Sequence, residues 1–161
     1  MSTAEFSLSP AEREAITSLI AYAPTPRAAC TDVLRYVQKQ KRFVSDQSFV
    51  EIAPLLGMSV AELDEVATFY NLIFRHKVGE SVLFLCNSVT CWMLGQPALE
   101  AHVLRRLGIK PGETSADGKV TLLPIVCLGH CDHAPAMLLD GALHGDLDCN
   151  KLDELLCLER I

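Results

Sequence analysis

Four of the seven cysteines fall in two closely spaced pairs, Cys86 with Cys91 and Cys127 with Cys131. Four residues separate the first pair, three separate the second, and 35 lie between Cys91 and Cys127. An odd total cannot pair completely in disulfides, and paired thiolates in a reducing compartment are more often metal ligands than a disulfide scaffold. The spacing therefore predicts a metal site built from these four side chains.

The length of the two loops bears on the choice of metal. Zinc sites built from paired cysteines usually use a C-x2-C turn, which aims both sulfurs at one ion. Both loops are longer here, and C-x4-C also occurs in one ferredoxin spacing. The spacing favours a [2Fe–2S] cluster over zinc, and it favours both over a disulfide. If the metal were zinc, the chain would be a zinc-stapled interaction module. A thioredoxin-like dithiol enzyme is disfavoured because the sequence contains no C-x-x-C.

Residues next to the cysteines agree with a cluster. We expect Cys91 in the first turn of a helix, where free backbone N–H groups can face cluster sulfur. Gly95 and Gly129 would allow the backbone to approach a cluster closely, although a helix and a turn also have ordinary uses for them. His130 and His133 are interpreted as loop residues, because four cysteines complete the coordination. Small apolar positions on helices are predicted for the other cysteines: Cys30, Cys149 and Cys157.

Composition excludes several classes of protein. The 161 residues are half apolar, which allows one domain or two small ones with a buried core. A formal charge of −6 argues against binding to nucleic acid, and no nucleotide-binding glycine motif is present. The longest apolar run, residues 122–128, is too short to span a membrane, and the first residues lack a basic signal sequence. We therefore expect a cytoplasmic protein that does not insert into membranes.

Helix-start signals organise the first half of the chain. Residues 1–8 are expected to be a loose tail, and four helices then follow, each predicted to begin at a capping residue: Ser9, Thr25, Ser45 and Ser59. In the fourth helix we expect Leu63, Val66, Phe69, Tyr70 and Leu72 to face inward. These helices predict an N-terminal helical bundle over residues 1–77.

The periodicity changes after residue 77. Strands are expected at four apolar stretches: 81–86, 120–127, 136–140 and near 143–144. Residues 91–107 have helical spacing, with Met93 and Leu94 on the buried face, and Asp148 should cap a last helix that extends to Leu158. The fold class is therefore α/β (α+β), with a small mixed sheet flanked by helices over residues 78–161. This layout is compatible with a thioredoxin-like domain.

At its cysteines the chain resembles the thioredoxin-like [2Fe–2S] component of NADH:quinone oxidoreductase (respiratory complex I), known in bacteria as the E subunit. The likeness rests on the spacing of the four cysteines and on the run Cys127-Leu-Gly-His-Cys131-Asp-His-Ala-Pro-Ala-Met137. It extends over nearly the whole chain, through further matching segments: 27–29, 37–40, 65–70, 110–112 and 117–118. Trp92 is an unusual residue for this family.

The resemblance implies one [2Fe–2S] cluster of the N1a type, with Cys86 and Cys91 on one iron and Cys127 and Cys131 on the other. It implies a partner, the F subunit, that carries NADH and FMN, and further iron–sulfur subunits of the peripheral arm. The chain would belong to an oxidoreductase without holding a complete active site, peripheral to the inner membrane through the complex. Similar subunits serve NAD-dependent formate dehydrogenases and NAD(P)-linked hydrogenases, so the parent complex stays open.

Overall fold

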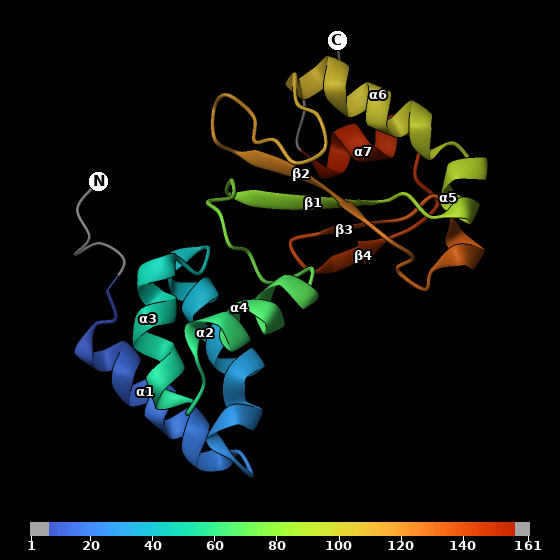
Figure 1. Ribbon diagram of the computed structural model, residues 1–161. Helices are drawn as coiled ribbons and strands as arrows, with labels where there is room; N and C mark the ends of the chain where they lie inside the picture. Colours follow the sequence, from blue (N-terminus) through green and yellow to red (C-terminus); the bar gives the residue numbers. More distant parts are fainter. Residues whose placement is uncertain (1–6, 157–161) are drawn as a thin grey trace. The chain divides into compact units, whose positions relative to one another are not determined.

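The computed structural model describes residues 7–156, and the chain divides into two compact units, Met1–Lys77 and Val78–Ile161. Figure 1 shows helices α1 to α4 in the first unit and a sheet with helices in the second. None of the helices within residues 7–156 is long and apolar enough to cross a membrane.

The first unit consists of helices that begin where the capping residues predict. Its helices are α1 (Pro10–Tyr22), α2 (Cys30–Lys41), α3 (Asp46–Leu55) and α4 (Val60–Phe69). The side chains of Ser9, Ser45 and Ser59 each accept a backbone N–H from the first turn, as expected. Thr25 also caps as expected, although it begins a 3-10 turn (Pro26–Ala29) that leads into α2.

The core of this unit lies between the four helices. It contains fully buried side chains from each of them, among which the largest are Ile16, Leu34, Phe49, Ile52 and Leu63. The inward orientation predicted for Phe69, Tyr70 and Leu72 is wrong, because these side chains are 78%, 47% and 37% exposed. Phe69 follows buried Ala67 by two residues, about 200° around the helix, and α4 ends there, so helical spacing no longer applies beyond it.

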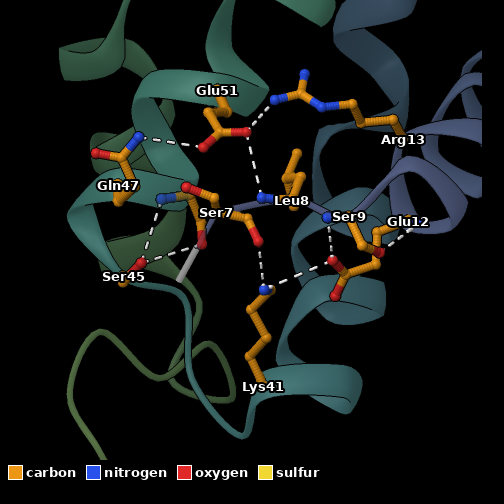
Figure 2. Close-up of polar contacts among 10 residues, drawn as sticks. Ser7, Leu8, Ser9, Glu12, Arg13, Lys41, Ser45, Gln47 and Glu51 are labelled. Atoms are coloured by element: carbon orange, nitrogen blue, oxygen red, sulfur yellow. Dashed lines mark hydrogen bonds and ion pairs between the residues drawn. The ribbon is translucent and has the colours of Figure 1, made fainter. Parts of the chain in front are cut away.

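The segment before α1 is held against the bundle. The backbone N–H of Leu8 donates to Oε2 of Glu51 at 3.2 Å, and Nζ of Lys41 donates to the Ser7 carbonyl oxygen at 2.7 Å (Figure 2). Arg13 pairs with the same carboxylate of Glu51. The side chain of Leu8 is buried in the core. The expected loose tail is therefore wrong for Ser7 and Leu8, and residues 1–6 of that prediction lie outside the described residues.

The second unit is built on a four-stranded mixed sheet, which confirms the α/β expectation. Its strands are β1 (Ser81–Cys86), β2 (Val120–Ile125), β3 (Met137–Leu139) and β4 (Ala142–His144), in the spatial order β2-β1-β3-β4. Strand β1 pairs with β2 in parallel and with β3 in antiparallel orientation. Because β1 is central and buried, its side chains are apolar on both faces, as the sequence predicted.

Three α-helices accompany this sheet: α5 (Val89–Met93), α6 (Gln96–Leu107) and α7 (Cys149–Leu155). Leu99 and Val103 of α6 and Leu152 of α7 share one buried apolar cluster with Leu83 and Leu85 of β1. Figure 1 shows both helices beside the sheet of this unit. The first cysteine pair lies where β1 leads into α5, because Cys86 is the last residue of β1 and Cys91 belongs to α5.

Several element boundaries differ from the sequence prediction. The strand expected over 120–127 ends at Ile125, and the one expected over 136–140 is limited to Met137–Leu139. The helix expected over 91–107 is divided, because Gly95 adopts a left-handed backbone (φ 111°) that ends α5 and starts α6 in a new direction. Met93 and Leu94 are consequently 72% and 57% exposed, so their predicted burial is wrong. Asp148 caps α7 as predicted, by accepting the Lys151 N–H. The helix ends at Leu155, with Leu156 as its C-cap, so the expected continuation is wrong at Leu156, and residues 157–158 of that prediction lie outside the described residues.

Candidate metal centre

The first cysteine pair lies on regular secondary structure. Cys86 is the last residue of β1, and its N–H donates to the Ala136 carbonyl oxygen at 3.1 Å. Cys91 is in the first turn of α5, as the sequence predicted, three residues after the N-cap Ser88. Both side chains are buried, at 1% and 2% exposure. The strand end and the short helix therefore hold these two sulfurs inside the protein.

The second cysteine pair lies on an irregular loop after β2. The sulfurs of Cys127 and Cys131 are 3.4 Å apart, and both residues are exposed. Gly129 turns the chain between them with a left-handed backbone (φ +76°), and its N–H lies 3.4 Å from Sγ of Cys127. Cys131 begins a 3-10 turn, Cys131–His133. This loop places two accessible sulfurs close to each other.

The cysteines of the two pairs influence each other's pKa. Burial raises the pKa of Cys91 to about 11, and the Cys86 sulfur and the charges of Cys86 and Cys131 act in the same direction. The thiol of Cys127 raises the pKa of Cys131, and the charge of Cys86 adds to this effect. The pKa of Cys127 itself is lowered, first by the Gly129 N–H and then by Cys131. A metal that binds thiolates would relieve the repulsion among these four groups.

Apolar residues and hydrogen-bond donors surround the sulfurs. Cys86, Cys91 and Ala136 form a buried cluster, against which Ile125 and Leu128 pack. The Gly129 N–H donates to the Cys127 sulfur, while the backbone of Ala136 acts to lower the pKa of Cys91 and the Thr90 hydroxyl acts to lower the pKa of Cys131. Donors of this kind stabilise negative charge on thiolate sulfur. The four cysteines and their surroundings therefore fit a thiolate-bound metal group such as an iron–sulfur cluster.

The sulfurs are arranged as pairs. Among residues 7–156, no group of three or more His, Cys, Asp or Glu side chains is placed to hold one metal ion. A [2Fe–2S] cluster needs two protein ligands at each of two irons, so pairs of cysteines satisfy its ligand requirement.

Two histidines lie on the second loop. The rings of His130 and His133 are 4.8 Å apart, and Nδ1 of His133 lies 2.7 Å from Oδ2 of Asp146. This hydrogen bond and the charges of Asp146 and Asp132 raise the pKa of His133. Both rings interact with carboxylates and with each other. They lie on the loop as expected, and that neither ligates the cluster stays a prediction.

Gly95 and Gly129 have ordinary backbone uses, as the sequence allowed, and their close approach to a cluster stays a prediction. A Cβ atom on Gly95 or Gly129 would meet no atom of the chain within 4 Å, whereas both residues have positive φ angles. Backbone conformation therefore explains these glycines in this chain. A close approach of the backbone to other residues occurs at Gly145, which faces His130 and His133 and was not identified from the sequence.

Other contributors were also missed. Thr90 stands directly before Cys91, so a hydroxyl inside the C-x4-C loop was a signal that could have been used. The effect of the Ala136 backbone and the contacts of Gly145 and Asp146 leave no signal in the sequence, because they depend on how β3 and β4 pack beside the loop. Among the remaining cysteines, Cys30 and Cys149 are half-buried first residues of α2 and α7, and Cys157 lies outside the described residues.

Comparison with known proteins gives the same cysteine chemistry. The model of the thioredoxin-like [2Fe–2S] ferredoxin family matches residues 16–158. The chain is 44% identical over 154 residues to the E subunit of NADH-quinone oxidoreductase from Escherichia coli (strain K12), covering 96% of this chain and 93% of that protein. It is 40% identical to the E subunit from Pseudomonas aeruginosa PAO1, with the same coverage.

Solved structures share the fold. A chain of the NAD+-reducing [NiFe]-hydrogenase in the air-oxidized state matches with a TM-score of 0.65 and 25% identity over 83% of this chain. The H2-reduced state matches with a TM-score of 0.66 and 24% identity over 76% of this chain. This chain spans only 22% and 21% of those hydrogenase chains.

Proposed function

This chain belongs to the thioredoxin-like [2Fe–2S] ferredoxin family, and we propose that it is an electron-transfer subunit of an NADH:quinone oxidoreductase. Cys86 and Cys91 hold one iron of a single [2Fe–2S] cluster of the N1a type, and Cys127 and Cys131 hold the other. The observation that supports this proposal is the presence of two cysteine pairs in one unit, one buried at the end of β1 and in α5 and one exposed on the loop after β2, in a chain that the family model matches. When bound, such a cluster accepts and donates one electron at a time.

Side chains and backbone N–H groups of this chain would control the access of water to the cluster and the hydrogen bonds to its cysteine ligands. Ile125, Leu128 and Ala136 exclude water from the side of the buried pair. The Gly129 N–H donates to the Cys127 sulfur, and the backbone of Ala136 acts to lower the pKa of Cys91, so both favour negative charge on sulfur. Burial and hydrogen bonds to sulfur are among the factors that set the potential of an iron–sulfur cluster.

The two compact units match separate roles in this proposal. Residues 1–77 form an N-terminal helical domain, and residues 78–161 form the cluster-binding domain. The partners are the F subunit, which carries FMN and NADH, and further iron–sulfur subunits of the peripheral arm. The chain lies on the cytoplasmic side, attached to the inner membrane through the complex. Support comes from the relatives named as E subunits, which this chain matches over 96% of its length.

The hydrogenase likeness is compatible with a related parent complex but does not favour it. It covers about a fifth of the hydrogenase chains, whereas the relatives named as E subunits are matched over 93% of their length.

Metal analysis of the full chain, isolated without oxygen, tests the proposal. We expect equal amounts of iron and acid-labile sulfide, visible colour, and an EPR signal of a [2Fe–2S] cluster after reduction. Colourless protein with stoichiometric zinc would instead support the zinc-stapled interaction module. Co-purification with a flavoprotein that oxidises NADH tests the partner, and a chain that remains alone when both are expressed together would contradict that part.

A further inference from the structure

The loop that carries Cys127 and Cys131 has little regular structure of its own. Its one regular element among the described residues is the three-residue 3-10 turn Cys131–His133. Within this turn the His133 N–H donates to the His130 carbonyl oxygen at 3.2 Å. Both cysteines are exposed, and between them only Leu128 packs, partly buried, against the apolar cluster of Cys86, Cys91 and Ala136. Their position therefore depends on contacts from another part of the chain.

The segment Gly145–Leu147, directly after β4, supplies such contacts. The Asp146 N–H donates to the His133 carbonyl oxygen at 2.6 Å, and the Asp146 carboxylate lies 2.7 Å from Nδ1 of His133. The Leu147 N–H donates to the Pro135 carbonyl oxygen at 3.1 Å. Two backbone bonds and one side-chain bond thus connect this segment with the end of the cysteine loop.

The segment is itself anchored. Leu147 is buried in the core between the sheet and α6 and α7. Nζ of Lys151, on α7, donates to the Gly145 carbonyl oxygen at 2.6 Å. The hydrogen bonds to the loop therefore start from a part of the unit that core packing holds in place.

Gly145 brings the backbone of this segment directly against both histidines. A Cβ atom at this position would lie 2.6 Å from Cβ and the carbonyl oxygen of His133 and 2.7 Å from Cδ2 of His130. Real Cβ contacts are not this short, and the His133 atoms are not the end of a flexible side chain. A side chain at position 145 must therefore separate this segment from the cysteine loop.

We propose that Gly145–Leu147 is a clamp that positions the Cys127–Cys131 loop for the cluster, with Gly145 and Asp146 as its positioning residues. The inference rests on the proposed function, because it assigns a supporting role at the same site. Groups that hold metal ligands in place control metal affinity, typically by 10- to 100-fold. They matter most where the ligands lie on a loop, as Cys127 and Cys131 do.

Three variants of the full chain and one control test the clamp. Gly145→Ala introduces the steric clash. Asp146→Gly removes the carboxylate and suits the left-handed backbone at this position (φ 50°), whereas Asp146→Asn keeps a hydrogen-bond acceptor. Gly79→Ala is the matched control. Its Cβ would also lie too close to backbone atoms, 2.9 Å from Gly118 and Lys119, but Gly79 precedes the start of β1, whereas Cys86 ends that strand.

The measurements are iron and sulfide content, the EPR spectrum of the reduced cluster, and the rate at which a chelator removes iron. We expect Gly145→Ala and Asp146→Gly to lose iron about 10-fold faster than the unmodified chain and to have altered EPR g values. Asp146→Asn should stay within about 3-fold of the unmodified chain. Gly79→Ala should lower the melting temperature while leaving the EPR spectrum and the rate of iron loss unchanged.

Each other outcome has a distinct meaning. Unchanged rates of iron loss and unchanged EPR spectra in both Gly145→Ala and Asp146→Gly would overturn the clamp. So would a rate of iron loss in Gly79→Ala equal to that in Gly145→Ala, because general destabilisation would then explain the effect. If the unmodified chain contains no iron or sulfide, the proposed function itself fails, and the two failures are thereby distinguished.

Discussion

The two cysteine pairs occupy opposite kinds of environment. Cys86 and Cys91 lie on a central strand and a helix, buried among apolar side chains. Cys127 and Cys131 lie on an exposed loop whose hydrogen bonds come partly from a distant segment. One pair is positioned by secondary structure and the core, and the other by a few specific polar contacts together with the partly buried side chain of Leu128. Two pairs with the same chemistry can therefore depend on different parts of the fold.

Replacement of the cysteines one at a time should have the largest effect. We expect each of Cys86→Ser, Cys91→Ser, Cys127→Ser and Cys131→Ser to lose or alter the cluster, measured by iron content and EPR. The metal-free variants should differ between the pairs. A hydroxyl without a partner in the buried pair costs about 1–3 kcal/mol of unfolding free energy, whereas the exposed pair should cost less than about 0.5 kcal/mol.

Cys30→Ser is the control for this series, since Cys30 is half-buried in α2, in the other unit. It should leave the cluster intact. Loss of the cluster in Cys30→Ser, or equal stability losses in the two pairs, would contradict the contrast.

The residues directly before each pair sharpen the same comparison. Leu85, before Cys86, is 2% exposed, and Val126, before Cys127, is 68% exposed. Leu85→Ala should lower the unfolding free energy by about 2–5 kcal/mol through the cavity it leaves, and Val126→Ala by at most about 0.5 kcal/mol. Denaturant unfolding of the metal-free chain measures both, and similar losses at the two positions would disprove the contrast in packing.

The reactivity of the thiols gives a third comparison. In the metal-free chain the pKa of Cys91 is about 11 instead of 9.0, which leaves roughly one-hundredth as much thiolate at pH 8. Cys127 is exposed and its pKa is lowered by the Gly129 N–H. We expect iodoacetamide to modify Cys127 first and Cys91 last, with the order read by mass spectrometry of peptides. Equal rates at both positions would show that the first pair is not buried.

The last prediction concerns the helical unit, where the ionised side chain of Glu51 contributes to stability in a pH-dependent way. Burial favours the neutral form of Glu51, but hydrogen bonds from Gln47, Leu8 and Ser7 and the charge of Arg13 outweigh it and lower the pKa. The ionised carboxylate therefore stabilises the folded state above the ordinary pKa of 4.5, and this contribution is lost as pH falls through the lowered value.

Glu51→Gln should accordingly lower the melting temperature by about 3 °C at pH 7, equivalent to ~1 kcal/mol. The difference from the unmodified chain should shrink below pH 4.5, which circular dichroism at several pH values can follow. A difference that persists unchanged in acid would show that the charge of Glu51 is not responsible.

Local signals in the sequence predicted much of the fold. The caps at Ser9, Ser45, Ser59 and Asp148 were recognisable because each capping side chain bonds to a backbone N–H three residues away. Strand β1 was recognisable from its continuous apolar run. The exposure of Phe69 and the division of the helix at Gly95 could not be predicted from apolar spacing, which does not reveal where a helix ends or turns.

By itself, the sequence determined the type of chemistry: four thiols in two spaced pairs and the capped and apolar segments around them. Only the tertiary structure decided that one pair is buried and the other exposed, and that Gly145 and Asp146 contact the second loop. The physical reason is distance along the chain. Caps and periodicity act over a few residues, whereas burial and the bonds between the segment after β4 and the loop arise when separate segments pack together.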